Sequence, residues 1–530
     1  MTRQHSIVVF SGDLAYSVRR RIVEIDRAIP GLSWLVVLQS ENKTPGQLLK
    51  SQWRNLRRNG WRWIPYQLAD IWRRLKRPEP AMLDAGVPGS EFTLSAVQNR
   101  PNLRLIRVPN LHAQACLDAV QAFEPDLGLS MAAPILRRSL FAIPRLGTIN
   151  LHKGKVPEYR GMPPAFWELW DDAKSVGCTV HRVDDKLDTG NVVCQAAVER
   201  AKHSTLTGLQ LQVDEVGMGL MRDAVSRIIG GNAASLPQAP GGSTHRKPTL
   251  AQAAALQRKL VLAQSPRSSL AARSLKSARS ALGFGAWRAG LRRLLTPRVT
   301  VVLYHRVSDD TRDNLTVGIE QFDRQMGLLR KHCRPVSIEQ ALAMDTVPRS
   351  DLPLVAVSFD DGYLDNCVNA APILMRHGIP ASFFVATGIV DAHGRFPHDM
   401  RRGNPPIPVM TWDHLRQMRD WGFTIGSHSV SHIDCAAEPE DTVRSELVRS
   451  REDLHRELGI AEPLFAYPYG GRQHMTPERL ELVKQAGYRG CLGAYGGTNV
   501  GRVDRYDVRR RGIHWEFSDS AFLFECLGLV

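Results

Sequence analysis

Short apolar runs alternate with amphipathic segments over the first 150 residues of the chain. Four runs have the length of a strand, and two of the segments between them repeat apolar residues with a helical period. They predict strands at residues 7–10, 34–38, 103–108 and 127–130, with helices at 19–28 and 113–123. Because such alternation is typical of a parallel, doubly wound sheet, we expect an α/β, Rossmann-like N-terminal domain.

The same alternation returns in the C-terminal part of the chain. A continuous apolar run at 354–359 predicts a buried strand. Helices are predicted at 321–331 and 412–421, and a charged helix with a solvated outer face at 438–458. These segments indicate a second α/β domain.

Composition limits the classes of protein that the chain can belong to. A length of 530 residues predicts two or three domains, and a hydrophobic fraction of 43% is ordinary for a globular protein. No apolar run approaches the ~18–20 residues of a membrane span, and the start of the sequence lacks the pattern of a signal peptide. The eight cysteines include no Cys-x-x-Cys pair, which argues against a zinc finger or a redox dithiol. We expect a cytoplasmic protein with reduced thiols.

Positive charge is concentrated between the two parts of the chain. The net charge is +16, and residues 224–308 contain 14 lysines and arginines but no acidic residue. We expect a domain at 1–240, a basic helical linker at 241–297 and a domain at 298–530. The linker could pack on an acidic face of either domain, lie on an anionic membrane surface, or bind nucleic acid, the least favoured of the three.

A second segment, residues 53–77, is dense in tryptophan and arginine. It could bind nucleic acid, a membrane surface or a sugar. The favoured interpretation is an amphipathic helix that packs its aromatic side chains on its own domain.

Three motifs in the C-terminal part carry residues suited to hydrolysis. Ser358-Phe-Asp-Asp-Gly362 places Asp360 and Asp361 at the end of the predicted strand, where the glycine lets the backbone turn and both acids reach one pocket. His428 and His432, four residues apart, match one face of a helical turn, a common spacing for metal ligands. A Pro-Tyr-Gly turn containing Tyr469 follows.

This set of motifs resembles the polysaccharide deacetylase (NodB-like) family over roughly residues 298–515. The resemblance implies a distorted (β/α) barrel that hydrolyses N-acyl sugars with a divalent metal, zinc by expectation. It implies three metal ligands, Asp361, His428 and His432. It also implies that Asp360 is the general base.

The remaining roles in this hydrolase are assigned with less support. The backbone N–H of Tyr469 is the expected oxyanion donor, and His514 is a weak counterpart of the family's late catalytic histidine. The family often has an arginine where Ala466 stands, and that arginine orients the base. One of the three arginines at 509–511 is expected to replace it.

A second group of polar residues lies in the N-terminal part. Asn150 and His152 are two apart at the end of a predicted strand, so their side chains share a face. Asp188 follows in a Leu-Asp-Thr-Gly turn, and a Pro-Glu-Tyr-Arg-Gly motif lies between at 157–161.

This pattern resembles the formyltransferase family over roughly residues 5–235, a family that includes methionyl-tRNA, glycinamide ribonucleotide and sugar N-formyltransferases. It implies formyl transfer from 10-formyltetrahydrofolate to an amine, with Asn150 and Asp188 also contributing to the folate site. Asn150 and His152 would stabilise the tetrahedral oxyanion, and Asp188 would orient His152 and help to remove the amine proton. Lys153 and Lys155 depart from the family pattern and suggest an anionic acceptor, or else are solvated loop charges.

The two resemblances together predict a bifunctional carbohydrate-modifying enzyme. One half would formylate an amino sugar, as a nucleotide- or lipid-linked sugar or an oligosaccharide, and the other would hydrolyse a sugar N-acyl amide. The alternative is a deacetylase whose formyltransferase-like half only binds sugar or acts as a scaffold.

Overall fold

The computed structural model describes most of the chain. The described residues are 5–39, 52–57, 60, 92–201, 204–232, 234–264, 297–310, 313–390, 396, 398–399 and 407–528. They belong to two compact units: unit 1 is Met1–Ala85 with Glu91–Ser265, and unit 2 is Gly86–Ser90 with Pro266–Val530.

Unit 1 is built on a seven-stranded sheet of order β3-β2-β1-β4-β5-β7-β8. Its first five strands are parallel, whereas β7 is antiparallel to both β5 and β8. The strands are β1 (Ser6–Ser11), β2 (Ser33–Gln39), β3 (Leu103–Val108), β4 (Leu127–Ser130), β5 (Thr148–His152), β7 (Ser175–Arg182) and β8 (Val192–Glu199). The parallel part has the order of a doubly wound sheet, which confirms the predicted Rossmann-like fold.

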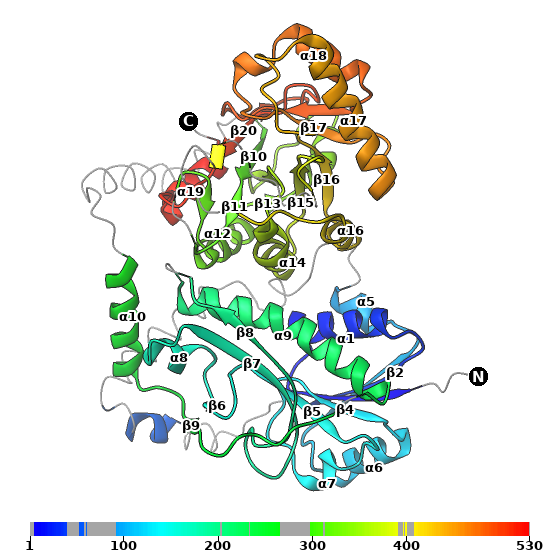
Figure 1. Cartoon of the computed structure of the whole chain (residues 1–530), viewed down its shortest axis with the longest axis vertical. Helices are drawn as coiled ribbons and strands as arrows, with labels where there is room; N and C mark the ends of the chain where they lie inside the picture. Colours follow the sequence, from blue (N-terminus) through cyan, green and yellow to red (C-terminus); the bar gives the residue numbers. More distant parts are fainter. Residues whose placement is uncertain are drawn as a thin grey trace. The chain divides into compact units, whose positions relative to one another are not determined.

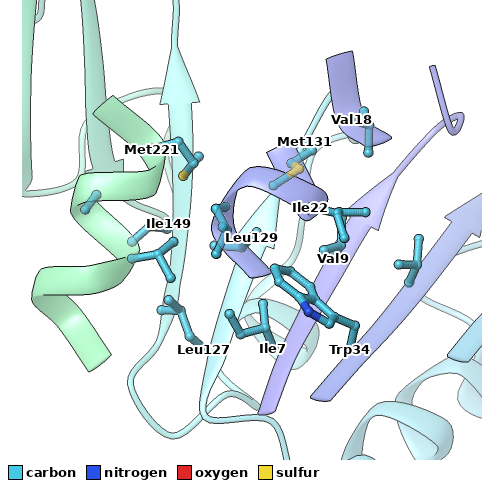
Figure 2. Packing of buried hydrophobic residues seen from close by; sticks show 14 of the residues in the cluster. Ile7, Val9, Val18, Ile22, Trp34, Leu127, Leu129, Met131, Ile149 and Met221 are labelled. Atoms are coloured by element: carbon cyan, nitrogen blue, oxygen red, sulfur yellow. The ribbon is translucent and has the colours of Figure 1, made fainter. Parts of the chain in front are cut away.

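Helices cover both faces of this sheet because successive strand residues point to opposite sides. Ile7 and Val9 pack under α1 (Tyr16–Ala28) and α9 (Leu206–Ile229), as Figure 2 shows. Val8 and Phe10 pack on the other face against α6 (Gln114–Phe123) and α7 (Arg138–Phe141). Figure 1 shows α1 and α9 side by side on their face. Each fully buried aliphatic or aromatic side chain contributes about 1.5–3 kcal/mol to folding.

Unit 1 extends beyond the boundary expected at residue 240. The strand β9 (Ser243–His245) pairs in parallel with β6 (Tyr159–Gly161). Leu256 and Leu260 of α10 (Leu250–Gln264) are buried in one cluster with Phe166 of α8 (Phe166–Trp170). The first part of the expected basic linker is therefore packed into unit 1 by apolar contacts, and residues 265–296 lie outside the described residues.

The tryptophan- and arginine-rich segment at 53–77 is described only in part. Trp53 is 58% exposed, and the guanidinium of Arg57 lies over its ring at 5.7 Å. Trp53 thus does not pack into a core, and most of the segment lies outside the described residues. Another short helix of unit 1, α5 (Leu94–Gln98), contacts α1.

Unit 2 contains a curved, mostly parallel sheet. Its central order is β18-β17-β16-β15-β14-β10, with β13 beside β14 and with β19 and β20 beside β10. The strands are β10 (Arg298–Tyr304), β13 (Arg334–Pro335), β14 (Leu354–Phe359), β15 (Ala381–Val385), β16 (Thr424–Ser427), β17 (Leu464–Ala466), β18 (Gly490–Leu492), β19 (Asn499–Val500) and β20 (Arg510–Gly512). Val508 pairs with Leu492 of β18 just before β20 pairs with β10. One short segment therefore touches both edges of the sheet, in agreement with the predicted distorted (β/α) barrel.

Helices lie between and around these strands (Figure 1). They are α12 (Ile319–His332), α13 (Ile338–Leu342), η3 (Asn366–Ala370), α14 (Ala371–His377), α16 (Trp412–Asp420), α17 (Glu440–Leu458), η4 (Arg472–His474), α18 (Pro477–Gln485) and α19 (Asp519–Cys526). A two-stranded sheet pairs β11 (Arg306–Val307) with β12 (Thr316–Val317). All eight cysteines are free. None of the described helices combines the length and the apolar character that a membrane crossing requires.

Candidate active sites

Three predicted metal ligands meet at the carboxyl ends of two strands of unit 2. Asp361 follows β14, and His428 and His432 follow β16. The Nε2 atoms of His428 and His432 lie 3.5 and 3.3 Å from Oδ1 of Asp361. Donor atoms of all three buried residues lie within 4.8 Å of one another. The fold thus brings this predicted set together.

The protonation of this cluster suits a divalent ion. Nδ1 of His428 donates to the carbonyl oxygen of Ala466 at 2.7 Å, which leaves the Nε2 lone pair facing Asp361. Within the described residues, both buried oxygens of Asp361 accept no hydrogen bond, an arrangement that is costly without a cation. Burial acts to raise the pKa of Asp361, but the positive charge that His428 and His432 carry when protonated holds it well below its usual value, as a bound cation would. A carboxylate and two imidazoles are a common ligand set for such ions.

The two histidines lie in a turn and not on a helix, which corrects the expectation from their spacing. Ser429 and His432 have φ values of +66° and +59°, in the left-handed region that a right-handed helix cannot contain. Glu446 of α17 holds this turn by accepting hydrogen bonds from the backbone N–H groups of Val430 and Ser431 at 2.9 and 2.8 Å. It also accepts one from the hydroxyl of Ser431 at 2.8 Å. The charged helix is therefore not only a solvated face.

Asp360 is paired with an arginine from β20. Nη1 and Nη2 of Arg510 donate to Oδ1 and Oδ2 of Asp360 at 2.6 and 2.8 Å, and both residues are buried. Nε of Arg510 donates to the carbonyl oxygen of Gly493 at 2.9 Å, which fixes the guanidinium. Burial acts to raise the pKa of Asp360, but neighbouring groups lower it, and the charge of Arg510 has the largest effect among them. The carboxylate is held in its ionised form.

Two further histidines lie beside this carboxylate pair. His305 follows β10, and burial lowers the pKa of its imidazole against the opposing charges of Asp361 and Asp360. Nε2 of His398 lies 3.6 Å from Oδ2 of Asp361 and 2.9 Å from the hydroxyl of Tyr363. The two oxygens of Asp361 thus face different imidazoles.

In unit 1, the predicted asparagine, histidine and aspartate meet at the carboxyl end of β5. Nδ1 of His152 lies 3.3 Å from Oδ2 of Asp188, which also accepts the backbone N–H of Gly161 at 3.1 Å. Asp188 lies in a turn with a φ of +54°. Because β4 and β5 are neighbours in the doubly wound part of the sheet, the site lies at the edge where such sheets bind ligands.

Both nitrogens of His152 are engaged. Nε2 lies 2.7 Å from the carbonyl oxygen of Tyr159, so this nitrogen carries the hydrogen and donates it. Burial lowers the pKa of His152, although Asp188 acts in the opposite direction. For Asp188, burial acts to raise the pKa, but the hydrogen bond from His181 and the charges of the two imidazoles lower it. The pair therefore combines a neutral imidazole with a carboxylate near neutral pH.

A fourth residue, His181 of β7, completes this cluster and does not stand out in the sequence. Its Nε2 lies 3.2 Å from Nδ2 of Asn150 and 3.4 Å from Oδ1 of Asp188. The sequence offers one signal for it: a histidine near the end of a predicted strand, a few residues before the Leu-Asp-Thr-Gly turn.

Comparison with known proteins finds one family match in each half of the chain. Residues 89–225 match the formyl transferase family, and residues 349–491 match the polysaccharide deacetylase family. The chain joins a formyl transferase domain to a polysaccharide deacetylase domain. The geometry in unit 1 therefore belongs to the formyltransferase domain, and that in unit 2 to the deacetylase domain.

Individual relatives match only parts of the chain. A methionyl-tRNA formyltransferase of Flavobacterium psychrophilum is 28% identical over 153 residues, which are 28% of this chain and 48% of that protein. The chain spans less than half the length of the curated relatives that it matches first. The solved deacetylase PplD of Streptococcus pyogenes is 20% identical, covering 43% of this chain and 98% of that one, with a TM-score of 0.37. A sugar N-formyltransferase from Shewanella is 15% identical, covering 48% and 88%, with a TM-score of 0.32.

Two residues predicted for the deacetylase site have different surroundings. Tyr469 is 43% exposed, and the centroid of its ring lies 5.0 Å from that of His432, so the residue borders the metal cluster. Nδ1 of His514 accepts the backbone N–H of Glu516 at 3.4 Å, and its ring packs on Phe517 at 4.7 Å. These contacts tie His514 to the segment after β20. The role of His514 as the catalytic histidine stays a prediction.

The two lysines near the formyltransferase site have carboxylate partners. Lys153 contacts Asp214 of α9, and Lys155 lies 3.3 Å from Glu158. Their charges are thus partly neutralised within the domain, which weakens the expectation that they bind an anionic acceptor.

Proposed function

We propose that the chain is a bifunctional carbohydrate-modifying enzyme. Its formyltransferase domain transfers a formyl group from 10-formyltetrahydrofolate to an amino sugar, and its deacetylase domain hydrolyses the N-acyl amide of a sugar with a divalent metal. The observation that carries the proposal is the presence, in one chain, of two separate buried clusters. Each cluster holds the groups that its reaction requires.

The formyltransferase cluster provides an oxyanion donor and a proton acceptor. The acceptor amine attacks the formyl carbon, and the bond from that carbon to N10 of the folate breaks. The side-chain amide of Asn150 donates to the developing oxyanion, and His152 assists it once its Nε2–H leaves the Tyr159 carbonyl. Asp188, held as a carboxylate, orients His152 and takes the proton that the attacking amine loses. This proton is passed on to N10, which leaves as a neutral secondary amine.

The deacetylase cluster fits a divalent ion held by Asp361, His428 and His432. When bound, such an ion supplies Lewis-acid polarisation of the amide carbonyl and activates water. Asp360 takes the proton of the attacking water, because Arg510 keeps the carboxylate ionised and fixes both of its oxygens. Zinc is the expected ion, as an aspartate and two imidazoles match its ligand preferences.

A histidine is needed to protonate the departing amine. We assign this role to His305, which follows β10 next to Asp360 on the neighbouring strand β14. It passes to the amine the proton that Asp360 takes from water. The backbone N–H of Tyr469, in a turn with a φ of +61°, is the proposed oxyanion donor.

An amino sugar is the substrate class that serves both domains. An amide hydrolase exposes a sugar amine, and a formyltransferase blocks one, so the two reactions either follow one another on a single nitrogen or act on two nitrogens of one sugar. The acceptor is a free, nucleotide-linked or lipid-linked amino sugar, and the enzyme is cytoplasmic.

Binding of 5-formyltetrahydrofolate, a stable analogue of the donor, tests the first half without knowledge of the acceptor. Calorimetry should show binding to the full chain that weakens in the N150A variant. Acetate release from N-acetylglucosamine oligomers tests the second half, and D361N should abolish it. Absence of folate binding would favour the alternative, a deacetylase with a scaffold domain.

The two halves can be separated by reciprocal variants. D188N should lose formyl transfer and keep hydrolysis, whereas D361N should lose hydrolysis and keep folate binding. Loss of both activities in either variant would contradict two independent sites.

A further inference from the structure

His181 has the position of an organising residue in the formyltransferase site. It lies on β7, which is antiparallel to β5, and the register pairs it directly with Asn150. The pairing of β7 with β8 is irregular between Val180 and His181. Such irregularities re-aim side chains and are frequent next to active sites. Only 3% of His181 is exposed.

The contacts of His181 fix which of its nitrogens carries a hydrogen. Nδ1 lies 2.8 Å from the carbonyl oxygen of Arg182, and a carbonyl oxygen can only accept, so Nδ1 is the donor. In the neutral ring Nε2 is then an acceptor. It lies 3.2 Å from Nδ2 of Asn150, which donates one of its two hydrogens to it. The amide of Asn150 is thereby fixed, with its second N–H free to point elsewhere.

The same nitrogen of His181 also lies 3.4 Å from Oδ1 of Asp188. It donates to that oxygen only when the ring is protonated, and it then no longer accepts from Asn150. His152 faces the other oxygen of that carboxylate, at 3.3 Å from Oδ2, and its Nε2–H is likewise engaged by a backbone carbonyl, that of Tyr159. Asp188 thus lies between two imidazoles, each of which uses its other nitrogen on the main chain. The cluster consists of four connected side chains.

We propose that His181 is a positioning residue for formyl transfer: its Nε2 fixes the side-chain amide of Asn150 in the neutral ring and pairs with the carboxylate of Asp188 in the protonated ring. The inference rests on the proposed formyl transfer. It deepens that function by explaining how two residues from different segments, Asn150 on β5 and Asp188 in its turn, are held in one geometry. Misplacement of a reacting group by about 1 Å can cost roughly 100-fold in rate.

Two substitutions separate the contacts of Nε2 with Asn150 and Asp188, here called the bridge, from the contact of Nδ1 with the carbonyl oxygen of Arg182. The side-chain amide of H181N reaches the position of Nδ1 and keeps the Arg182 contact, but it loses the bridge to Asn150 and Asp188. The longer side chain of H181Q reaches the position of Nε2 and restores the bridge. The matched control is H5N, since Nδ1 of His5 also faces a carboxylate, Oδ2 of Asp126 at 3.3 Å, at the opposite edge of the same sheet.

The kinetic test uses the full chain, 10-formyltetrahydrofolate and a panel of free and nucleotide-linked amino sugars. We expect H181N to lower kcat by about 100-fold while the Kd for 5-formyltetrahydrofolate stays within about threefold. H181Q should recover part of the rate, and H5N should match the wild type. A wild-type kcat in H181N, or equal losses in H181N and H181Q, would overturn the proposal.

A spectroscopic test is independent of the acceptor. His152 is faced by Asp188, the Tyr159 carbonyl, His181 and Arg160, and the charge of His181 acts to lower its pKa. With 15N-labelled histidine, NMR should therefore show His152 titrating at a higher pH in H181N than in the wild type. An unchanged titration of His152 would contradict the contact of His181 with Asp188. Failure of the wild type to bind folate would instead contradict the proposed function, while this titration would still report on the geometry.

Discussion

Both terminal nitrogens of Arg510 donate hydrogen bonds to the carboxylate of Asp360, at 2.6 and 2.8 Å, although the two residues are 150 positions apart in the sequence. The guanidinium also lies over the ring of Phe384 at 5.5 Å. The resemblance to the deacetylase family implied that one of the arginines at 509–511 replaces an arginine at the position of Ala466, and Arg510 makes this contact. The fold thus supplies the same charge to the base from β20, at the closing edge of the barrel.

Replacing Arg510 should affect both stability and hydrolysis. R510M leaves a buried carboxylate without its partner, which costs about 3–5 kcal/mol of unfolding free energy. Hydrolysis of N-acetylglucosamine oligomers should fall to background, because Asp360 is no longer fixed or kept ionised. The control is R509M, whose half-exposed pair with Asp507 at 3.1 Å is worth about 0–1 kcal/mol. Wild-type hydrolysis in R510M would contradict the assigned role of this pair.

The sequence predicted the elements of the fold more fully than the contacts between them. The buried strand at 354–359 matches β14 at both ends, because a continuous apolar run carries its own signal. The sequence indicated only that one of three consecutive arginines would contact Asp360. The register of β20 against β10 decides which of the three points inward, and here it is Arg510.

His181 shows the same limit for the site. Its neighbour Asn150 is adjacent only because β5 and β7 are antiparallel in a particular register, and a local sequence pattern does not encode that register. The histidine pair at 428 and 432 was predicted on a helix, because the spacing alone does not reveal the left-handed residues of a turn.

Zinc binding should distinguish the roles of the two carboxylates of the deacetylase site, Asp361 as a metal ligand and Asp360 as the base. D361N should lower the affinity for Zn²⁺ by more than about 100-fold, since even partners outside the ligand set are worth 10–100-fold. D360N should bind Zn²⁺ as the wild type does, yet lose hydrolysis. Calorimetry on the chelator-treated chain measures the Zn²⁺ affinity of both variants, and acetate release from N-acetylglucosamine oligomers measures hydrolysis. Binding of 5-formyltetrahydrofolate is the control for folding. Equal metal affinities in the two variants would show that the roles are misassigned.

Glu446 should be important for metal affinity although it lies outside the ligand set. It accepts three hydrogen bonds from Val430 and Ser431, which lie between the two histidine ligands in the sequence. E446A should therefore loosen the turn and weaken Zn²⁺ binding by about 10–100-fold. The control is E452A, an exposed glutamate on the same helix, which should bind Zn²⁺ as the wild type does. Equal Zn²⁺ affinities in E446A and E452A would show that Glu446 does not support the histidine ligands.

Glu168 of α8 should make the formyltransferase domain sensitive to pH. Burial raises the pKa of its carboxyl from 4.5 to about 7, Asp171 adds to the shift, and its buried Oε1 has no hydrogen-bond partner among the described residues. Between these two values the folded state binds more protons than the unfolded state, so stability falls as the pH rises through this window. The carboxyl should therefore destabilise the domain above about pH 7 and have little effect below about pH 4.5.

The substitution E168Q removes this titration and keeps the shape of the side chain. It should raise the free energy of unfolding by about 1–3 kcal/mol near pH 8, and the gain should shrink as the pH is lowered to about 5. Urea denaturation of the domain at the two pH values measures this difference. The control E199Q changes an exposed glutamate of β8, where water solvates the charge in both states, and should show no such dependence. A gain in E168Q that is the same at both pH values would indicate a packing effect and would exclude the titration of Glu168 as its cause.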